Sequence, residues 1–175
     1  MDIIVDKNFK FPKFEKIIDF PMKFLKVLTK KTRDNHVSII EGSHRSTSGA
    51  SFKKLSKDYA ILKKGKYGHN KPNLKASGLL LEHLEPNKPE KSSRRVRISY
   101  GIRSGKQHPR NSGSLPSAKL MTYHQEGTET MPARDISGEK ALHNDTRDKV
   151  VDDLVNQVAK NIEGALKPYK ADLTI

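Results

Sequence analysis

The chain has 175 residues, of which 34% are hydrophobic and 31% are charged, and it contains no Cys and no Trp. This length fits a single domain, residues 1–175, with one modest core and without the large interior of a big enzyme. Without Cys, disulfides, Cys-based zinc sites and thiol nucleophiles are excluded. The first residues do not follow a signal-peptide pattern, and no stretch approaches the roughly 18 apolar residues of a membrane span. We therefore expect a soluble protein, made in a cytoplasm, with no membrane partner.

The net charge of +14 is distributed unevenly. Residues 1–110 hold 26 basic and 10 acidic residues, whereas residues 111–175 hold 8 and 10. A chain that is basic at one end and mildly acidic at the other can dock head-to-tail with copies of itself, or contact nucleic acid. The same charges could serve solubility alone, because the lysines are spread out and form no single block.

Residues 1–50 are interpreted as an N-terminal helical extension. Apolar residues from Phe14 onward recur at roughly helical spacing and predict a helix that runs to about Asp34. Pro21 interrupts it and predicts a kink or a new helix start, because proline lacks an N–H and clashes with the preceding turn. Residues 41–51 are rich in Ser, Gly and His and predict a loop.

The next predicted helix runs from Leu55 to about Lys64, with Leu55, Tyr59 and Leu62 on one face. Ser56 is a suitable N-cap, and Gly65 is expected to end the helix. The apolar run that follows in residues 74–84 is compatible with either a helix or a strand.

A strand is predicted at residues 95–103, where apolar residues alternate with Arg and Ser in the period of a half-buried strand. Residues 104–117 hold two Gly and two Pro among polar residues and predict a long mobile loop. A loop of this length in a small domain usually binds something or is disordered.

The clearest helix pattern is near the C-terminus, at residues 150–166, where apolar residues repeat at i, i+3/i+4 and i+7. Acidic residues crowd its start, where the helix dipole favours negative charge, and Gly164 and Pro168 mark its end. We expect its apolar stripe to pack on the sheet formed by residues 96–100, and residues 167–175 to form a C-terminal arm.

A search for catalytic and metal-binding motifs finds none. The seven His residues have no metal-ligand spacing, and neither a phosphate-binding Gly-x-x-x-x-Gly-Lys motif nor a Gly-x-Ser-x-Gly elbow occurs. His124 and Glu126 could form an acid–base pair, but two residues apart on a strand they would lack a third group to orient them. We predict no catalytic residue, no metal and no cofactor, and a protein that is not an enzyme.

Residues 123–135 combine a Gly turn and a Pro turn just ahead of the last helix. One interpretation packs Tyr123 and Met131 inward and exposes Arg134. Arg134 could then form an internal ion pair with the acidic residues around the start of the last helix. Alternatively, its guanidinium reaches a carboxylate on a neighbouring subunit.

Three blocks of sequence carry a resemblance to a known family. Residues 123–127 (Tyr-His-Gln-Glu-Gly) and 131–134 (Met-Pro-Ala-Arg) resemble the "Y-H-Q-x-G … P-A-R" signature of the phage virion-morphogenesis and tail-completion family of Mu-like and P2-like phages. Residues 55–63 resemble its "L-S-x-x-Y-A-x-x-K" helix, and residues 74–80 its "L-x-x-T-G-x-L" element, with Ser77 in place of Thr. The blocks follow the family's order, and the family-like core covers residues 55–166.

The resemblance implies an α+β fold, with a small, mostly antiparallel sheet packed by a long C-terminal helix, N-terminal helices and long loops. It implies a structural virion protein of a tailed bacteriophage, a tail-completion, tail-terminator or neck protein that joins tail to head. Its partners would be copies of itself in a ring of six or twelve, together with neighbouring neck, connector and tail tube proteins. It would be assembled in the host cytoplasm and reside in the tail or neck of the virion.

The candidate residues follow from this interpretation. The subunit-interface candidates are Tyr123, His124, Gln125, Gly127, Pro132, Ala133 and Arg134. Basic residues that could face a partner, or packaged DNA in a channel, are Arg94, Arg95, Arg97 and Arg103; such DNA contacts would be non-specific. The alternative function is a basic nucleic-acid-binding protein, which the net charge favours but the lack of aromatics on the basic strand does not.

Overall fold

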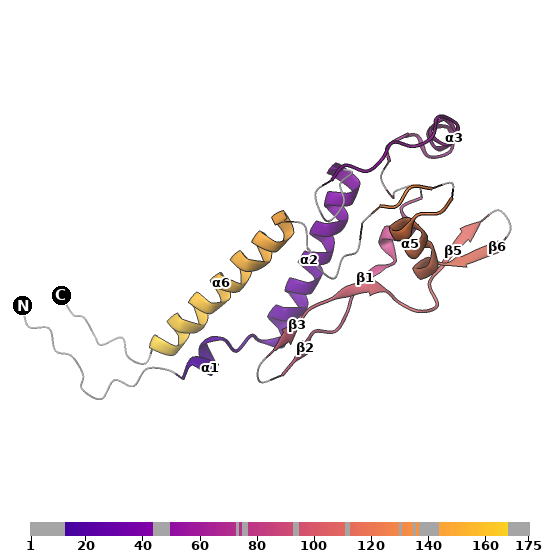
Figure 1. Ribbon diagram of the computed structural model, residues 1–175. Helices are drawn as coiled ribbons and strands as arrows, with labels where there is room; N and C mark the ends of the chain where they lie inside the picture. Colours follow the sequence, from indigo (N-terminus) through magenta and orange to yellow (C-terminus); the bar gives the residue numbers. More distant parts are fainter. Residues whose placement is uncertain are drawn as a thin grey trace, which may run out of the picture.

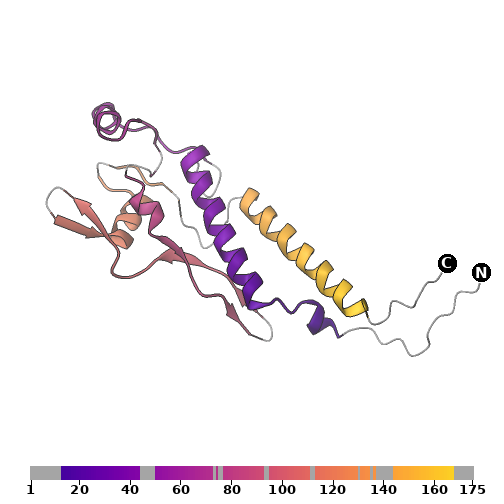
Figure 2. The same ribbon diagram turned by 180° about the vertical axis from the view of Figure 1, so that it is seen from behind.

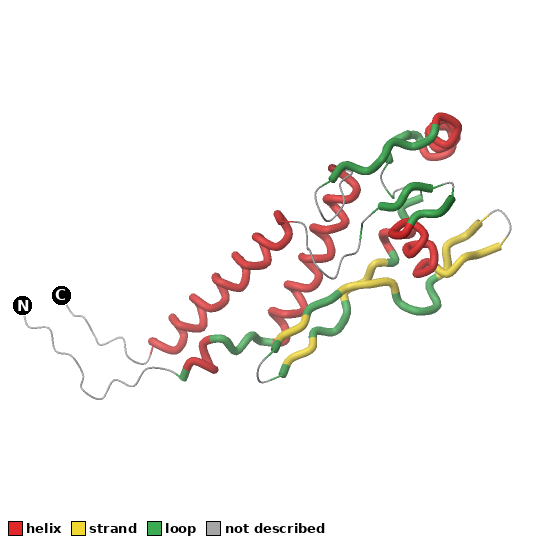
Figure 3. The backbone as a smooth tube through the Cα atoms, viewed as in Figure 1, coloured by secondary structure: helices red, strands yellow, loops and turns green. Residues whose placement is uncertain are grey.

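The computed structural model describes residues 13–43, 50–72, 74, 77–92, 95–110, 113–129, 131–134, 136 and 144–167. Two long helices lie side by side along one flank of the molecule, and short antiparallel strands lie along the other (Figures 1, 2 and 3). The predicted α+β class is confirmed. Most of the C-terminal arm, residues 168–175, lies outside the described residues, as does the first part of the N-terminal extension.

The N-terminal region forms α1 (Phe14–Ile17) and α2 (Met22–Ser43). Pro21 stands at the predicted new helix start, and its carbonyl accepts a hydrogen bond from the N–H of Leu25 at 3.1 Å. The helix continues past the predicted end near Asp34, because its last turns are held by core contacts that the local pattern does not show. As a result, the predicted loop at residues 41–51 begins inside α2.

The predicted strand at residues 95–103 is divided between two short strands. Val96 is 37% exposed, so the half-buried alternation is not formed there. The strands make one interrupted antiparallel arm, in which Asn87 N–H donates to the carbonyl of Ser99 at 2.9 Å between the two ladders. Pro86 and Pro89 have no N–H to donate, which limits the ladder to short pieces. The pairs are β1 (Leu84–Pro86) with β4 (Tyr100–Ile102), and β2 (Glu90–Lys91) with β3 (Val96–Arg97).

The mobile loop predicted at residues 104–117 contains a hairpin instead. β5 (Gln107–Arg110) pairs with β6 (Gly113–Pro116), with His108 opposite Leu115. Residues 111–112 lie outside the described residues. The side chains of β6 are exposed or only half-buried. Because this strand has no buried face, its sequence lacks the alternation of apolar and polar residues that would have indicated a strand.

Three shorter helices surround this hairpin and the core: α3 (Lys57–Tyr67), α4 (Leu79–Glu82) and α5 (Ser117–Glu126). α3 ends at Gly68, which adopts a left-handed φ of 75° and donates its N–H to the carbonyl of Lys64. Gly65, the predicted end, lies inside the helix. The ambiguous run at residues 74–84 contributes α4 and the start of β1, whereas α5 occupies residues expected to form a loop and a strand.

The last helix, α6 (Asn144–Leu166), runs antiparallel to α2, not across the sheet (Figure 1). The expectation that its apolar stripe packs on the sheet is therefore wrong. The face of α6 toward α1 and α2 is largely polar, whereas Val151 and Val155 are 48% and 60% exposed. The contacts across this face include Asn35 Nδ2 to Thr146 Oγ1 at 2.7 Å, Lys31 to Asp153 at 3.1 Å, and Asn161 Nδ2 to the carbonyl of Ile17 at 2.8 Å.

The apolar core lies between the C-terminal half of α2, the arm and α4. Arg33 ties these elements together, since its Nε donates to the carbonyl of Leu84 at 2.6 Å and its Nη2 to that of Leu81 at 2.8 Å. The core residues are Ile40, Phe52, Leu74, Leu81, Leu84 and Ile136. Within the part of the chain that is described, no helix is both long and apolar enough to cross a membrane.

Candidate functional site

A cavity of about 600 Å³ lies on the side of the molecule away from α6, between α3, the end of α5 and the segment that follows α5. All three family-like blocks contribute to its wall. Tyr59 and Lys63 come from the first block, Leu74 and Leu80 from the second, and Arg134 from the third. Blocks that are separated in sequence thus meet around one space.

α3 presents a stripe of polar side chains to this cavity. Tyr59, Lys63 and Tyr67 recur every four residues, a spacing that places them on one face of the helix. Lys63 is only 2% exposed, and its Nζ donates to the carbonyl of Lys71 at 2.7 Å. The predicted face was partly wrong, because Leu62 points to solvent.

A tight reversal after α5 brings Arg134 back beside this helix. Gly127 has a left-handed φ of 81°, and a Cβ there would lie 2.7 Å from the backbone nitrogen of Ala133. Thr128 N–H donates to the carbonyl of Met131 at 2.8 Å, and Arg134 N–H donates to the carbonyl of His124 at 2.7 Å. Only glycine fits the first position of this turn without displacing backbone.

Arg134 is buried, which corrects the interpretation that exposes it. Its side chain is 5% exposed, and its Nε has no hydrogen-bond partner among the described residues. Within the same residues it forms no ion pair. Asp148, one of the acidic residues near the start of α6, pairs with Arg147 instead. Asp135, Glu139 and the side chain of Asp145 lie outside the described residues.

Burial, with neighbouring positive charge for Lys63 and His124, lowers the pKa values of the basic groups in the cavity. Burial, together with the charge of Arg134, lowers the pKa of Lys63 to about 8. Burial also lowers the pKa of His124 to about 4, with further contributions from Arg134, His108 and Lys63. Burial lowers the pKa of Arg134 as well, although an arginine remains protonated at neutral pH. The cavity at pH 7 therefore holds a neutral imidazole and two buried cations.

The remaining interface candidates divide into two groups. Tyr123 and Pro132 line the cavity, and Lys119 Nζ lies 5.8 Å from the centre of the Tyr123 ring. Gln125 is half-buried and Ala133 is exposed, and neither lines the cavity.

The basic candidates on the arm do not join this site. Arg95 and Arg97 are exposed, and Arg103 pairs with Glu85 at 2.9 Å. Arg94 lies outside the described residues. Arg95, Arg97 and Arg103 do not line the cavity that the three blocks surround.

Two possible catalytic contacts have structural explanations. His124 and Glu126 lie on α5, not on a strand, so residues two apart point in different directions. His83 Nδ1 lies 2.7 Å from Ser117 Oγ, but Ser117 is fully buried, and this hydrogen bond ties the end of α4 to the start of α5. Among the described residues there is no group of three or more His, Asp or Glu side chains that could hold a metal ion.

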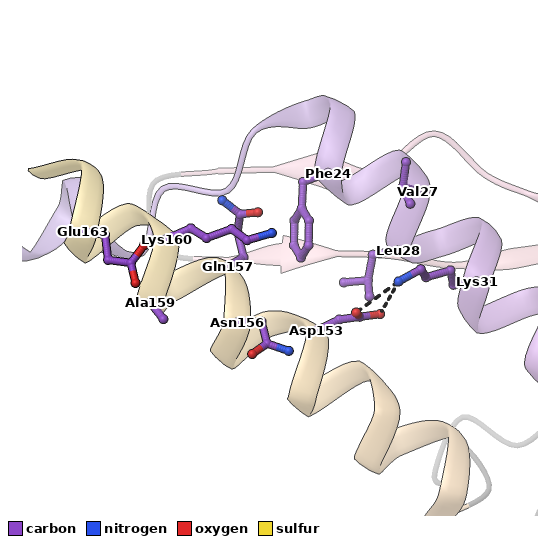
Figure 4. Close-up of a pocket in the computed structure, with 10 residues that line it drawn as sticks. All are labelled: Phe24, Val27, Leu28, Lys31, Asp153, Asn156, Gln157, Ala159, Lys160 and Glu163. Atoms are coloured by element: carbon purple, nitrogen blue, oxygen red, sulfur yellow. Dashed lines mark hydrogen bonds and ion pairs between the residues drawn. The ribbon is translucent and has the colours of Figure 1, made fainter.

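A second cavity, of about 460 Å³, lies between α2 and α6. Figure 4 shows Lys31 reaching from α2 to Asp153 on α6 across this space. Phe24 and Leu28 line its α2 side, and Gln157 and Lys160 its α6 side. This cavity keeps part of α2 and α6 apart, in keeping with the polar face that α6 turns toward α2.

Arg134 and His124 were predicted to belong to the site, whereas Lys63, Tyr67 and His108 were not. A signal for two of them was present in the four-residue spacing of Tyr59, Lys63 and Tyr67; His108 reaches the cavity only through the unpredicted hairpin.

Comparisons of the chain with protein-family models, curated proteins and solved structures found no match.

Proposed function

We propose that this protein is a structural component of a tailed-phage virion, which completes the tail or joins it to the head as one subunit of a ring. Its activity would be binding, without catalysis. The resemblance of the three sequence blocks to the virion-morphogenesis family is the basis of the proposal, and their convergence on one cavity supports it, because it gives the three blocks a common structural role.

The observation that carries the assembly role is the exposure of part of the apolar stripe of α6. Val151, Val155 and Ile162 are exposed in succession along one side of the helix. An amphipathic helix normally turns such a stripe toward its own core, and grouped exposed apolar side chains favour a protein contact. Ile61 and Leu62 on α3, at the other side of the molecule, are exposed as well. Two different exposed apolar surfaces suit a head-to-tail contact, which closes into rings when the rotation allows it.

Negative-stain imaging and native mass spectrometry of the purified full chain test this proposal. The expected result is a closed ring of six or twelve copies. A protein that stays monomeric at all concentrations, both alone and with phage tail tubes, would contradict it.

Nucleic-acid binding remains the second candidate, favoured by the exposed Arg95 and Arg97 near the tip of the arm and by the net charge of +14. A DNA-binding protein should be retained on DNA-cellulose and released steeply as salt rises. Retention that is lost in an Arg95→Gln, Arg97→Gln double variant, in a chain that forms no rings, would favour this second function.

A further inference from the structure

The outer face of α3, the side turned away from the cavity, is apolar at its centre and basic around it. Ile61 and Leu62 are 72% and 57% exposed, although large apolar side chains of a helix normally turn inward. Lys57 lies one turn before Ile61 and Lys64 nearly one turn after it, and both lysines are exposed. Asp58 is the one acidic residue in the sequence of this helix. The outer face of α3 therefore combines exposed apolar side chains with a net positive charge.

Gly65 leaves room on this same face. It follows Ile61 by about one helical turn, inside α3. Glycine inside a helix is less favourable than alanine, and a Cβ added at Gly65 would meet no atom within 4 Å. Packing among the described residues therefore does not require glycine here. Its missing side chain lets a second helix come close to the backbone of α3 beside Ile61.

The outer side of α6 carries the opposite combination. On the side away from α2, this helix exposes three large apolar side chains, those of Val151, Val155 and Ile162. One edge of that stripe holds three exposed acidic side chains, those of Asp148, Asp152 and Glu163. An apolar stripe with an acidic edge is suited to a partner surface that is apolar and basic.

The lysines of α6 do not cancel this acidic edge, because they are turned toward α2. Lys149 Nζ donates to Asn35 Oδ1 at 3.0 Å, and Lys160 lines the cavity between the two helices (Figure 4). The single arginine of α6, Arg147, pairs with Asp148 at 3.4 Å. A net negative charge therefore remains on the outer side of α6.

The two surfaces match in length but lie too far apart to meet within one molecule. α3 has 11 residues, and the stripe from Val151 to Ile162 covers as many residue steps, so each is about 16 Å long at a rise of about 1.5 Å per residue. Figures 1 and 2 both show α3 and α6 on different sides of the molecule, with α2 between them. A contact between these two surfaces therefore joins two copies of the chain.

We infer that the outer face of α3 on one copy docks on the apolar stripe of α6 on the next copy, with Lys57 and Lys64 facing the acidic edge of α6. The apolar side chains provide the contact, and the complementary charges set its orientation. Each copy offers one surface of each kind, so the contact is head-to-tail. The choice of a second copy as the partner rests on the proposed function, whereas the match between the two surfaces does not.

Two other occupants fit these surfaces less well. An antiparallel contact between two α6 helices would bring their acidic edges together, and a parallel one would set each acidic edge against a single arginine, Arg147. Nucleic acid would pair with the lysines of α3, but it would leave the exposed side chains of Ile61 and Leu62 without an apolar partner. Both alternatives are outcomes of the tests below.

Two surface variants and their mixture test the docking directly. Ile61→Asp alters the α3 surface and Val155→Asp the α6 stripe, and because both side chains are exposed, the melting temperatures of the monomers should stay close to that of the wild type. In native mass spectra each variant should be monomeric alone. Their equimolar mixture should give a mixed dimer and nothing larger, because only one intact pair of surfaces remains. Val96→Asp, at an exposed valine of β3, is the matched control and should assemble as the wild type does.

The mixture is measured well above the concentration at which the wild type assembles, because a single contact holds the mixed dimer together. Assembly of Ile61→Asp to the wild-type extent would overturn the inference, as would a mixture that stays monomeric.

Charge reversal tests which side chains face each other. The pair Lys57→Glu and Lys64→Glu should weaken association about tenfold or more, and so should the pair Asp152→Lys and Glu163→Lys. All four substitutions in one chain should restore association to within about threefold of the wild type, because opposite charges face each other again. A four-substitution variant that folds normally but associates no better than either pair would overturn the inference.

The same measurements separate the docking from the ring. If the mixed dimer forms while the wild type makes open chains in place of rings of six or twelve, the docking stands and the ring proposal fails. If the wild type forms rings and Ile61→Asp forms them equally well, the ring proposal stands and the docking is overturned.

The two alternative occupants give results of their own. If Ile61→Asp forms dimers and Val155→Asp does not, α6 binds α6, and the inference is overturned. If the variant with Lys57→Glu and Lys64→Glu assembles normally but no longer binds an oligonucleotide that the wild type binds, the α3 face serves nucleic acid, and the inference is overturned as well.

Discussion

The two sides of α2 are held to the rest of the molecule by different kinds of contact. On one side, the last turns of α2 share an apolar core with α4 and β1, and Arg33 donates to two backbone carbonyls across that junction. On the other side, α6 is attached through polar side chains, and Val151, Val155 and Ile162 of its apolar stripe are exposed. The first junction has the composition of a stable core. The second is typical of a helix that completes its packing in an assembly.

The largest expected effect is a truncation to Ala in the core, compared with a truncation to Ala on the stripe. Leu81→Ala should cost about 2–5 kcal/mol in free energy of unfolding, because Leu81 is almost fully buried in the core cluster. Val155→Ala should change it by less than about 0.5 kcal/mol, as expected for an exposed position. Urea unfolding of the monomeric chain measures both. Similar losses for the two variants would contradict the division between the two sides.

The pH dependence of stability should locate part of the acid sensitivity on the cavity side. The pKa of His124 is about 4 in the folded protein, whereas the ordinary histidine pKa is 6.5, so the unfolded state takes up the proton first as pH falls. Its contribution is thus complete above pH 6.5 and is lost as pH falls toward 4, by up to about 3 kcal/mol. His124→Gln should flatten the profile in this window when unfolding is followed at each pH. A variant profile parallel to that of the wild type would place the titrating group elsewhere.

The turn after α5 should be more sensitive than glycines in open positions. Gly127→Ala should cost about 1–3 kcal/mol, because it adds a left-handed alanine and a Cβ that overlaps the backbone at Ala133. Gly65→Ala is the matched control inside α3. It meets no atom within 4 Å, so it should stabilise the chain by up to about 1 kcal/mol. The melting temperatures of the two variants, measured by thermal unfolding, should shift in opposite directions relative to the wild type. Shifts of the same sign would show that the turn is not fixed in this way.

The smallest effect is expected at the ion pair across α2 and α6. Lys31 is largely exposed, so a double-mutant cycle with Asp153 should give a coupling energy of about 0.2–1 kcal/mol that decreases at high salt. A larger coupling that is insensitive to salt would mean that the polar side of α6 contributes more to its attachment than its exposure suggests.

The sequence predicts helices well where the pattern is amphipathic, and it predicts poorly where short strands lack a buried face. Pro21 marked the start of α2, and the periodicity of residues 150–166 marked α6, although not the direction that its stripe faces. Periodicity reports that one side of a helix is apolar, but not whether that side meets its own chain or another. The hairpin β5–β6 was missed because its strands carry proline and little apolar alternation.

The site could be predicted only in part for a related reason. Residues 123–134 stood out because glycine and proline fix a turn, and the structure places Gly127 in a conformation that requires glycine. The sequence does not indicate that Lys63 is buried, since a lysine is usually solvated. Its burial depends on Arg134 and α5 arriving from far along the chain, which no local pattern records.

The most direct test of the assembly account is Val155→Asp in the centre of the α6 stripe. Because Val155 is 60% exposed in the monomer, the free energy of unfolding of the variant should lie within about 1 kcal/mol of that of the wild type. In an assembly that covers the stripe, the same carboxylate would be buried without a partner, and the ring should be absent in native mass spectra. A folded variant that still forms the wild-type ring would contradict the account, as would a loss of several kcal/mol in the monomer.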